Sequence, residues 1–195
     1  MLSAHDRNLL RVLPALEQIL KSPRQTWRGY AQLASELEMD CTEFALLVET
    51  FVQNNNAGLR TPDEVWNAAD EILQVMLNAV AEGVQSKQET QVTPGDWGQR
   101  LFRFDSLFGS LWSAFAGAIA AQEHNAGMGV VAAAPTGGAS GTLPGVLYGL
   151  KNSLSPSAQK LIEALFVAGL VGRVAFSRGP VSGAQSGCGG EIGIY

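Results

Sequence analysis

The segment around Cys188 contains the residue with the clearest potential for chemistry. Cys188 lies within residues 187–191 (GCGGE), where the neighbouring glycines have no side chain that could bury a thiol. A thiol in such an open segment is typical of a metal or cluster ligand or of a reactive nucleophile. The other cysteine, Cys41, is followed by Glu43 and Phe44 in an expected helix, which favours a core or surface thiol.

The glycine-rich residues 127–145 could also bind a ligand, because backbone N–H groups approach a ligand closely where no side chain intervenes. Residues 127–132 have the spacing of a dinucleotide-binding fingerprint, but an expected helix precedes them and the next acidic residue is the distant Glu163. Residues 137–145 lack the Gly-Lys-Ser/Thr of a nucleotide-binding loop. Tight helix packing with turns is the structural alternative for these glycines.

His124 ends an expected apolar helix. A histidine at this position interacts favourably with the helix C-terminus, and imidazole is also a common proton-transfer group. The residues alone leave both interpretations open.

Three blocks follow one another in the second half of the chain. Residues 122–134 (QEHNAGMGVVAAA) lead into 135–147, which looks like an A-P-T-x-G-x-x-G-x-x-P-x-V-L segment, and 182–193 match S-G-A-x-x-G-C-x-x-E-x-G. Upstream, 93–96 (TPGD) look like an altered S-G-x-T-G-G-D-A loop. Together these blocks resemble the α chain of the iron–sulfur-dependent L-serine dehydratases (L-serine ammonia-lyases). The resemblance covers residues from about 60 to 195.

The resemblance implies a lyase that converts L-serine to pyruvate and ammonia with a [4Fe–4S] cluster held by cysteine thiolates. An open iron of the cluster acts as a Lewis acid on the β-hydroxyl while a base removes the α-proton. It implies Cys188 as a metal ligand and His124 and Ser182 as catalytic residues. The substrate-binding candidates are Thr136, Gly137, Gly138 and Ser140.

The sequence departs from the family pattern in its cysteines. The family has two further cluster cysteines beyond the one matched by Cys188, and this sequence has only the unmatched Cys41. We therefore expect a family α chain that is incomplete at its C-terminus, possessing one of three ligands. The alternative is a degenerate, non-catalytic homologue or an assembly subunit. Serine is not distinguished from threonine or cysteine as substrate, and a β chain or a homo-oligomer is an open partner.

The elements that must position these residues are helices. Apolar spacing and capping signals predict a mostly α-helical, bundle-like fold whose glycine-rich loops converge on one site. One apolar face is expected at Val65, Ala68, Ile72, Met76 and Val80. N-caps are expected at Ser22, Asp40 and Thr61. The expected helices are 3–20, 23–38, 41–54, 62–87, 97–122 and 155–174. The polar residues 84–96 suggest a linker between an N-terminal helical segment, 1–88, and a glycine-rich core, 89–195.

Composition restricts the partners. The net charge of −5 and the lack of any Lys/Arg cluster argue against nucleic acid and anionic membrane surfaces. Residues 106–122 are uncharged but short for a membrane span. Two cysteines and an N-terminus without a secretory pattern favour the reducing cytoplasm. Of the 22 glycines, 19 fall in residues 93–195, and this asymmetry needs a structural explanation.

Overall fold

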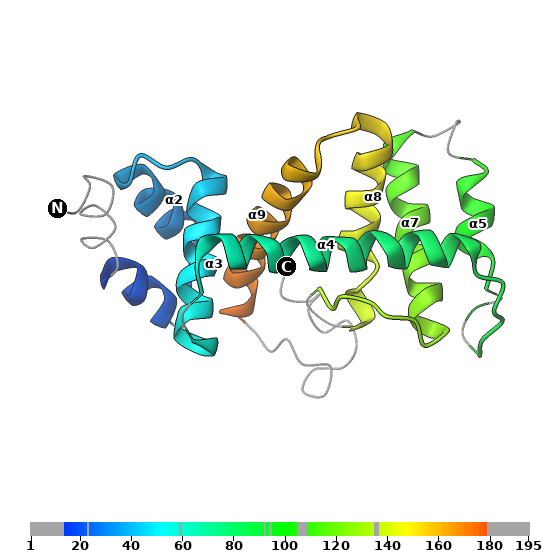
Figure 1. Cartoon of the computed structure of the whole chain (residues 1–195), viewed down its shortest axis with the longest axis horizontal. Coiled ribbons are helices and arrows are strands. Elements are labelled where there is room, and N and C mark those ends of the chain that lie inside the picture. The colour runs from blue at the N-terminus through cyan, green and yellow to red at the C-terminus, as the bar shows by residue number, and fades with distance from the viewer. Residues whose placement is uncertain are drawn as a thin grey trace. The chain divides into compact units, whose positions relative to one another are not determined.

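The regular structure of the described residues is helical. The computed structural model describes residues 14–22, 24–58, 60–91, 93, 95–104, 109–134 and 137–178. Within these ranges, residues 14–21 form a helix. The other elements are α2 (Trp27–Glu36), α3 (Cys41–Ala57), α4 (Pro62–Gln85), α5 (Trp97–Phe102), α7 (Ser110–Ala126), the short 3₁₀ helix η1 (Gly137–Ala139), α8 (Thr142–Leu154) and α9 (Ala158–Phe176) (Figure 1). The expected mostly α-helical fold class is confirmed.

These helices divide into two compact units. Unit 1 contains the described residues up to Asn67 and from Glu163 onward, and unit 2 contains Ala68–Ile162. The division falls inside α4 and α9. The domain boundary expected between residues 88 and 89 stays a prediction.

Two of the three expected N-caps are confirmed. Asp40 caps α3 by accepting hydrogen bonds from Thr42 N and Glu43 N, and the Glu43 carboxylate accepts one from Asp40 N in return. Thr61 and Glu64 form the same reciprocal arrangement at α4. The hydrogen bonds from the Thr61 backbone N–H and hydroxyl hold the pKa of Glu64 below its usual value.

The helix start expected at Ser22 is wrong. Among the described residues, the Ser22 hydroxyl hydrogen-bonds the backbone of Arg24 and not the first turn of a helix, and α2 begins at Trp27. Its N-cap is Thr26, whose Oγ1 accepts a hydrogen bond of 3.2 Å from Gly29 N. A threonine three residues before a glycine gave no capping-box signal, because the reciprocal acidic residue is absent.

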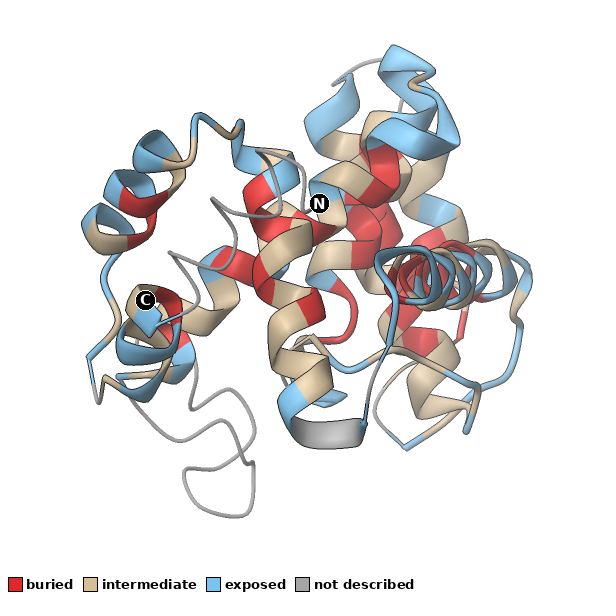
Figure 2. Ribbon diagram, turned by 60° about the vertical axis from the view of Figure 1, so that its left-hand side comes forward, coloured by how far each residue is buried: buried red, intermediate tan, exposed pale blue. Residues whose placement is uncertain are grey.

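The buried face of α4 is rotated from the expected one. Val65, Met76 and Val80 are buried as expected, but Ala69 and Leu73 are buried in place of the neighbouring positions. Ile72, expected in the core, is exposed. Both stripes satisfy the helical spacing of three and four residues, so periodicity alone does not separate them. Figure 2 shows that buried and exposed positions occupy different sides of the helices.

The helix expected over 97–122 is interrupted. Its first part, α5, ends at Phe102, and α7 begins only at Ser110. Gly109, which precedes α7, has φ 71°, a left-handed conformation that a continuous right-handed helix does not contain. In contrast, α3 continues beyond the expected 54 to Ala57.

A seam of small residues joins α7 and α8, which lie side by side (Figure 1). A Cβ on Gly145 would lie 2.4 Å from Ala114 O and 2.5 Å from Ala118 N. A Cβ on Gly141 or Gly149, about one turn away on either side, would lie 2.4 Å from Ala118 O or 2.8 Å from Ala114 N of α7. These glycines of α8 are therefore explained by backbone contact with α7.

An ion pair joins α3 to α9 within unit 1. The Arg173 guanidinium donates a hydrogen bond of 2.5 Å to the Glu49 carboxylate. Burial alone would raise the pKa of Glu49, but the hydrogen bonds from Gln53 and Arg173 and the charge of Arg173 outweigh it and hold that pKa below its usual value. Glu49 is therefore ionised at neutral pH.

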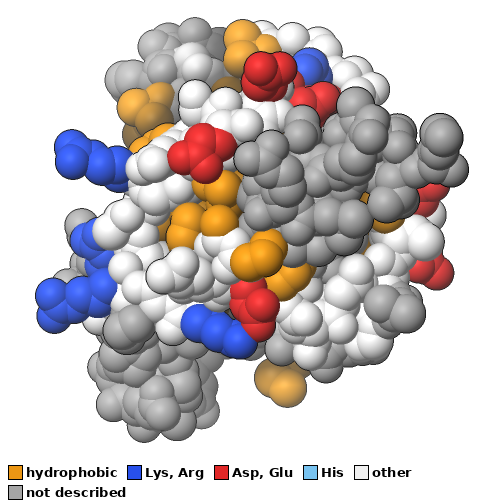
Figure 3. Space-filling view, turned by 90° about the vertical axis from the view of Figure 1, so that its left-hand side faces the viewer, with side chains coloured by type: hydrophobic (Ala, Val, Ile, Leu, Met, Phe, Trp, Pro, Cys, Tyr) orange, Lys and Arg blue, Asp and Glu red, His pale blue; other side chains and the backbone are white. Residues whose placement is uncertain are grey.

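No helix in the described part of the chain is long and apolar enough to cross a membrane. On the face shown in Figure 3, acidic, basic and hydrophobic side chains are interspersed.

Replacing Gly145 with valine should lower the free energy of unfolding by about 1–3 kcal/mol, because the contacted atoms are backbone and do not move aside. Urea unfolding followed by circular dichroism measures this. Gly172→Ala on α9 is the control: its Cβ would meet nothing within 4 Å, so a small gain in stability is expected. An equal fall in the free energy of unfolding of both variants would contradict the close backbone contact between α7 and α8.

Glu49→Gln should weaken the fall in the free energy of unfolding that occurs as the pH is lowered into the acid range. The folded-state pKa lies below the unfolded value near 4.5, so the carboxylate stabilises the fold above pH 4.5 and loses that effect as pH falls through the folded pKa. At pH 7 the variant should lose about 1–3 kcal/mol, and the difference from wild type should shrink in acid. Unfolding midpoints across the pH range test this, with the exposed Glu71→Gln as control.

Candidate functional site

The end of α7 carries four consecutive polar residues, Gln122–Asn125, which contact three other segments of unit 2. Glu123 binds residues 93–98, Gln122 and Asn125 bind residues 137–140, and the His124 ring lies beside α4. The two loops that the sequence singles out are thus attached to adjacent positions of one helix.

Glu123 is a buried carboxylate with three hydrogen bonds. Its side chain accepts from Thr93 Oγ1 at 2.5 Å, Trp97 N at 3.0 Å and Gly98 N at 2.8 Å, and the residue is only 3% exposed. Hydrogen bonds to an ionised acceptor contribute about 1.5–3 kcal/mol each, which offsets the cost of burial. The carboxylate therefore ties α7 to the residues around the start of α5.

Glu123 replaces the usual helix cap of α5. Asp96 occupies the N-cap position but makes no side-chain cap hydrogen bond, and its carboxylate pairs with Arg100 instead. The first N–H groups of α5 go to Glu123, where its negative charge also interacts favourably with the helix dipole. At the other end of α5, Trp112 Nε1 donates to Leu101 O at 2.8 Å. Both ends of this short helix are thus held by α7.

Gln122 and Asn125 hold the second loop through its carbonyl groups. Gln122 Nε2 donates to Gly138 O at 2.8 Å and Asn125 Nδ2 to Gly137 O at 3.4 Å. Ser140 is fully buried, and its hydroxyl donates to Gly137 O at 2.7 Å. The carbonyl groups of η1 therefore face α7.

The N–H groups of the same loop are left open. Within the described part of the chain, neither Gly137 N nor Gly138 N donates a hydrogen bond, and both glycines are exposed. A Cβ on Gly137 would meet nothing within 4 Å. Backbone donors without a covering side chain are suited to an anionic group such as a carboxylate.

His124 is held between α4 and the chain that follows α7. Its Nε2 lies 3.6 Å from Glu82 Oε2, and the side chain is 16% exposed. A Cβ on Gly129 would lie 2.2 Å from His124 Nε2, so a larger residue at 129 would displace the ring. Gly129 N also donates to His124 O at 2.8 Å.

The structure describes four of the seven residues that the sequence proposes for the site. Gly137, Gly138 and Ser140 lie together on the loop attached to α7, and His124 lies on α7 beside the residues that attach it. Thr136, Ser182 and Cys188 lie outside the described residues.

Sequence reasoning missed the residues that hold the loops, Gln122 and Glu123. A signal was present for Glu123: it is the first charged residue after the uncharged run 106–122, near a helix C-terminus where a negative charge is unfavourable without a partner.

The described residues do not form a site for an iron–sulfur cluster. Among them, no group of three or more His, Cys, Asp or Glu is placed to bind a metal ion. Cys41, the described cysteine, is exposed at the start of α3 in unit 1.

Comparison with known proteins gives a family for most of the chain. The family described as "Serine dehydratase alpha chain" matches residues 13–194. The Bacillus subtilis (strain 168) "Probable L-serine dehydratase, alpha chain" is 36% identical over 140 residues, which cover 69% of this chain and 46% of that protein. The Escherichia coli (strain K12) "L-serine dehydratase 2" is 28% identical over 177 residues, covering 83% of this chain and 38% of that protein. The chain thus spans less than half the length of these relatives. No solved structure matches it.

Glu123→Gln should release the residues around the start of α5. The amide keeps one acceptor oxygen but loses the charge, so Trp97 N and Gly98 N exchange with solvent faster, and the free energy of unfolding falls by about 1–3 kcal/mol. Amide hydrogen exchange measured residue by residue is the readout. The exposed Glu71→Gln on α4 is the control, and unchanged protection at residues 97 and 98 would argue against the role of Glu123.

Proposed function

Since the chain belongs to the serine dehydratase alpha chain family, we propose that it supplies substrate-binding loops of an L-serine dehydratase. Such an enzyme eliminates water from L-serine and yields pyruvate and ammonia. The observation that carries the proposal is the attachment of both glycine-rich loops to adjacent residues of α7, Gln122 and Glu123. Placing two loops from one rigid helix is what a small-substrate site requires.

The loop at residues 137–140 is proposed to bind the substrate carboxylate. Gln122 and Asn125 occupy its carbonyl groups, and the N–H groups of Gly137 and Gly138, which donate no hydrogen bond within the described residues, are the proposed donors to the carboxylate. Thr136, next to this loop, is a further proposed contact. Ser140 is fully buried and hydrogen-bonded to Gly137, so its role here is to hold the loop in shape.

Elimination requires a base for the α-proton and assistance for the departing hydroxyl. His124 and Ser182 are the proposed catalytic residues. The His124 imidazole lies beside Gly129, with its Nε2 3.6 Å from the Glu82 carboxylate. A second titratable group in contact with it is what proton transfer uses in other enzymes.

Cys188 is the proposed ligand to a [4Fe–4S] cluster. Three thiolates are needed, and the 195 residues contain two cysteines, of which Cys41 lies in unit 1 on α3. The other ligands must therefore come from residues outside this sequence, in the same or another polypeptide. We also propose that the chain acts with a beta chain, since two relatives are named as alpha chains. The proposed location is the cytoplasm, the compartment that the low cysteine count favours.

The two-cysteine count also favours a second candidate, a non-catalytic homologue or assembly subunit. The two candidates differ in whether these residues support elimination when a complete thiolate set is present.

A chimaera tests the proposal. The part of this chain that aligns with the Bacillus subtilis alpha chain, 69% of its length, replaces the matching segment of that protein. The chimaera is purified without oxygen together with the subunits that the Bacillus enzyme requires. We expect cluster absorbance and pyruvate formation from L-serine, both abolished by Cys188→Ser. Gln122→Ala should lower kcat/KM by about tenfold to 100-fold, because the loop is displaced.

Gln74→Ala is the matched control, since Gln74 is an exposed helical glutamine that hydrogen-bonds only Asp70. A folded chimaera that holds the cluster but forms no pyruvate would favour the non-catalytic homologue. Equal activity of the two glutamine variants would remove the loop from the proposed mechanism.

A further inference from the structure

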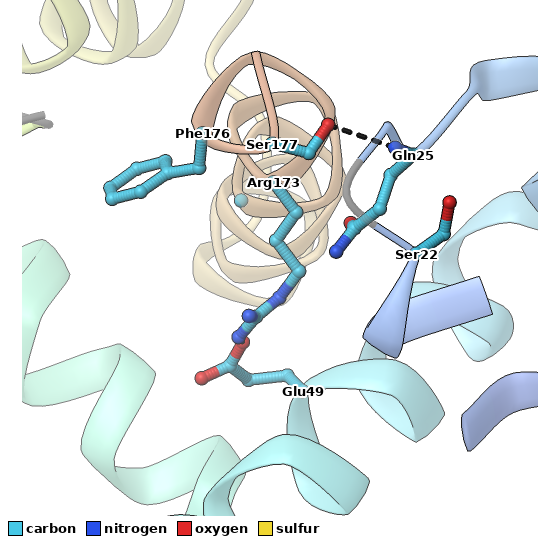
Figure 4. A pocket seen from close by; sticks show the side chains of 7 residues that line it. Ser22, Gln25, Glu49, Arg173, Phe176 and Ser177 are labelled. Atoms are coloured by element: carbon cyan, nitrogen blue, oxygen red, sulfur yellow. Dashed lines mark hydrogen bonds and ion pairs between the residues drawn. The ribbon is translucent and has the colours of Figure 1, made fainter. Parts of the chain in front are cut away.

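Unit 1 contains a cavity that the proposed dehydratase reaction does not use. It has a volume of about 380 Å³, within the usual range of small-molecule sites. All the residues that line it belong to unit 1, whereas the loops attached to α7 belong to unit 2. Figure 4 shows the cavity at the end of α9, with Glu49 below it and Gln25 and Ser22 beside it.

The cavity wall carries one positive and one negative group. Arg173 extends from α9 toward Glu49 on α3, and their side chains are 26% and 28% exposed (Figure 4). The pair uses one N–H of the guanidinium, and within the described residues Arg173 makes no other side-chain hydrogen bond. A guanidinium has five N–H donors, so Arg173 has donors beyond the one that it gives to Glu49, and a carboxylate is the acceptor that matches them.

The surrounding polar groups are hydrogen-bonded within unit 1. Gln25 N donates to Ser177 Oγ at 2.9 Å, and Ser177 Oγ donates to Val174 O at 2.7 Å. The Gln25 side chain is held by Leu20 O and the Tyr30 hydroxyl. These polar groups are paired among themselves, and the charged groups of the wall are Arg173 and Glu49, which pair with each other. Glu49 also accepts a hydrogen bond from Gln53. The end of α9 adds its partial negative charge on the same side as Ser177.

Gly169 also lines the cavity without a packing reason to be glycine. It lies inside α9, where glycine is a poor helix former, and a Cβ there would meet nothing within 4 Å. The seam glycines of α8 differ, because each contacts α7. A larger side chain at 169 would therefore enter the cavity and not the protein core.

From this geometry we infer that the cavity of unit 1 binds a small zwitterion of the α-amino acid type, with its carboxylate on Arg173 and its ammonium on Glu49. A ligand with one charge of each sign matches the balanced pair on the wall. A simple anion would place a second negative charge beside Glu49. A simple cation would place a second positive charge beside Arg173.

Calorimetric titration of the purified chain with three probes tests the inference. L-Alanine has both charged groups and no leaving group at its β-carbon, propionate lacks the ammonium, and ethylammonium lacks the carboxylate. We expect L-alanine to bind with a Kd of about 1 mM or tighter and each of the other two at least about tenfold more weakly. Equal affinities for L-alanine and propionate, or no binding of L-alanine, would overturn the inference.

Variants locate the binding. Gly169→Leu fills the cavity and should abolish L-alanine binding, whereas Gly172→Leu, on the same helix with equally open space and outside the lining, should not. Arg173→Lys keeps the charge but loses the guanidinium fork, so the affinity should fall at least about tenfold. Circular dichroism confirms that the variants are folded. Undiminished binding by Gly169→Leu or Arg173→Lys would place the ligand elsewhere, including at the loops of unit 2, and would overturn the inference without affecting the proposed dehydratase function.

Discussion

The buried carboxylate of Glu123 is the interaction on which the geometry of the candidate site depends. It lies near the C-terminal end of α7, where the helix dipole disfavours a negative charge, and it is almost fully removed from water. Its three donors all come from residues 93–98. Glu123 therefore keeps its hydrogen-bond partners only while that segment stays in place, so the local structure and the buried side chain hold each other.

Close backbone packing holds α4, α5 and α8 against α7, the helix that carries Glu123. Gly83 of α4 and Gly98 of α5 both face Ala120 of α7, at distances that no larger residue could accept. With the α8 seam, these contacts pack α4, α5 and α8 against α7, and the polar end of α7 holds the loops. Among the described glycines of unit 2, some therefore serve helix contact, as Gly83, Gly98 and Gly145 do, and Gly137 and Gly138 leave backbone exposed.

The sequence was informative where a residue acts through its local neighbours. The caps at Asp40 and Thr61 and the helical class follow from short-range patterns. It was uninformative where tertiary contacts decide. Thr26 caps α2 without a reciprocal partner, Leu73 replaces Ile72 in the core, and Glu123 binds donors more than twenty residues away. The loop glycines of the site were found through a family resemblance, but the side chains that hold them were not.

The seam between α7 and α8 also limits how the protein can change over evolutionary time. A bulky substitution in a core is often rescued when a neighbouring side chain becomes smaller. At Gly145 the nearest atoms are backbone atoms of Ala114 and Ala118, which no substitution of those residues can make smaller. Gly129 differs, because its close neighbour is the side chain of His124. Second-site suppressors are thus accessible at the loop after α7 and absent along the seam, so the helix pair should diverge more slowly than the segments it supports.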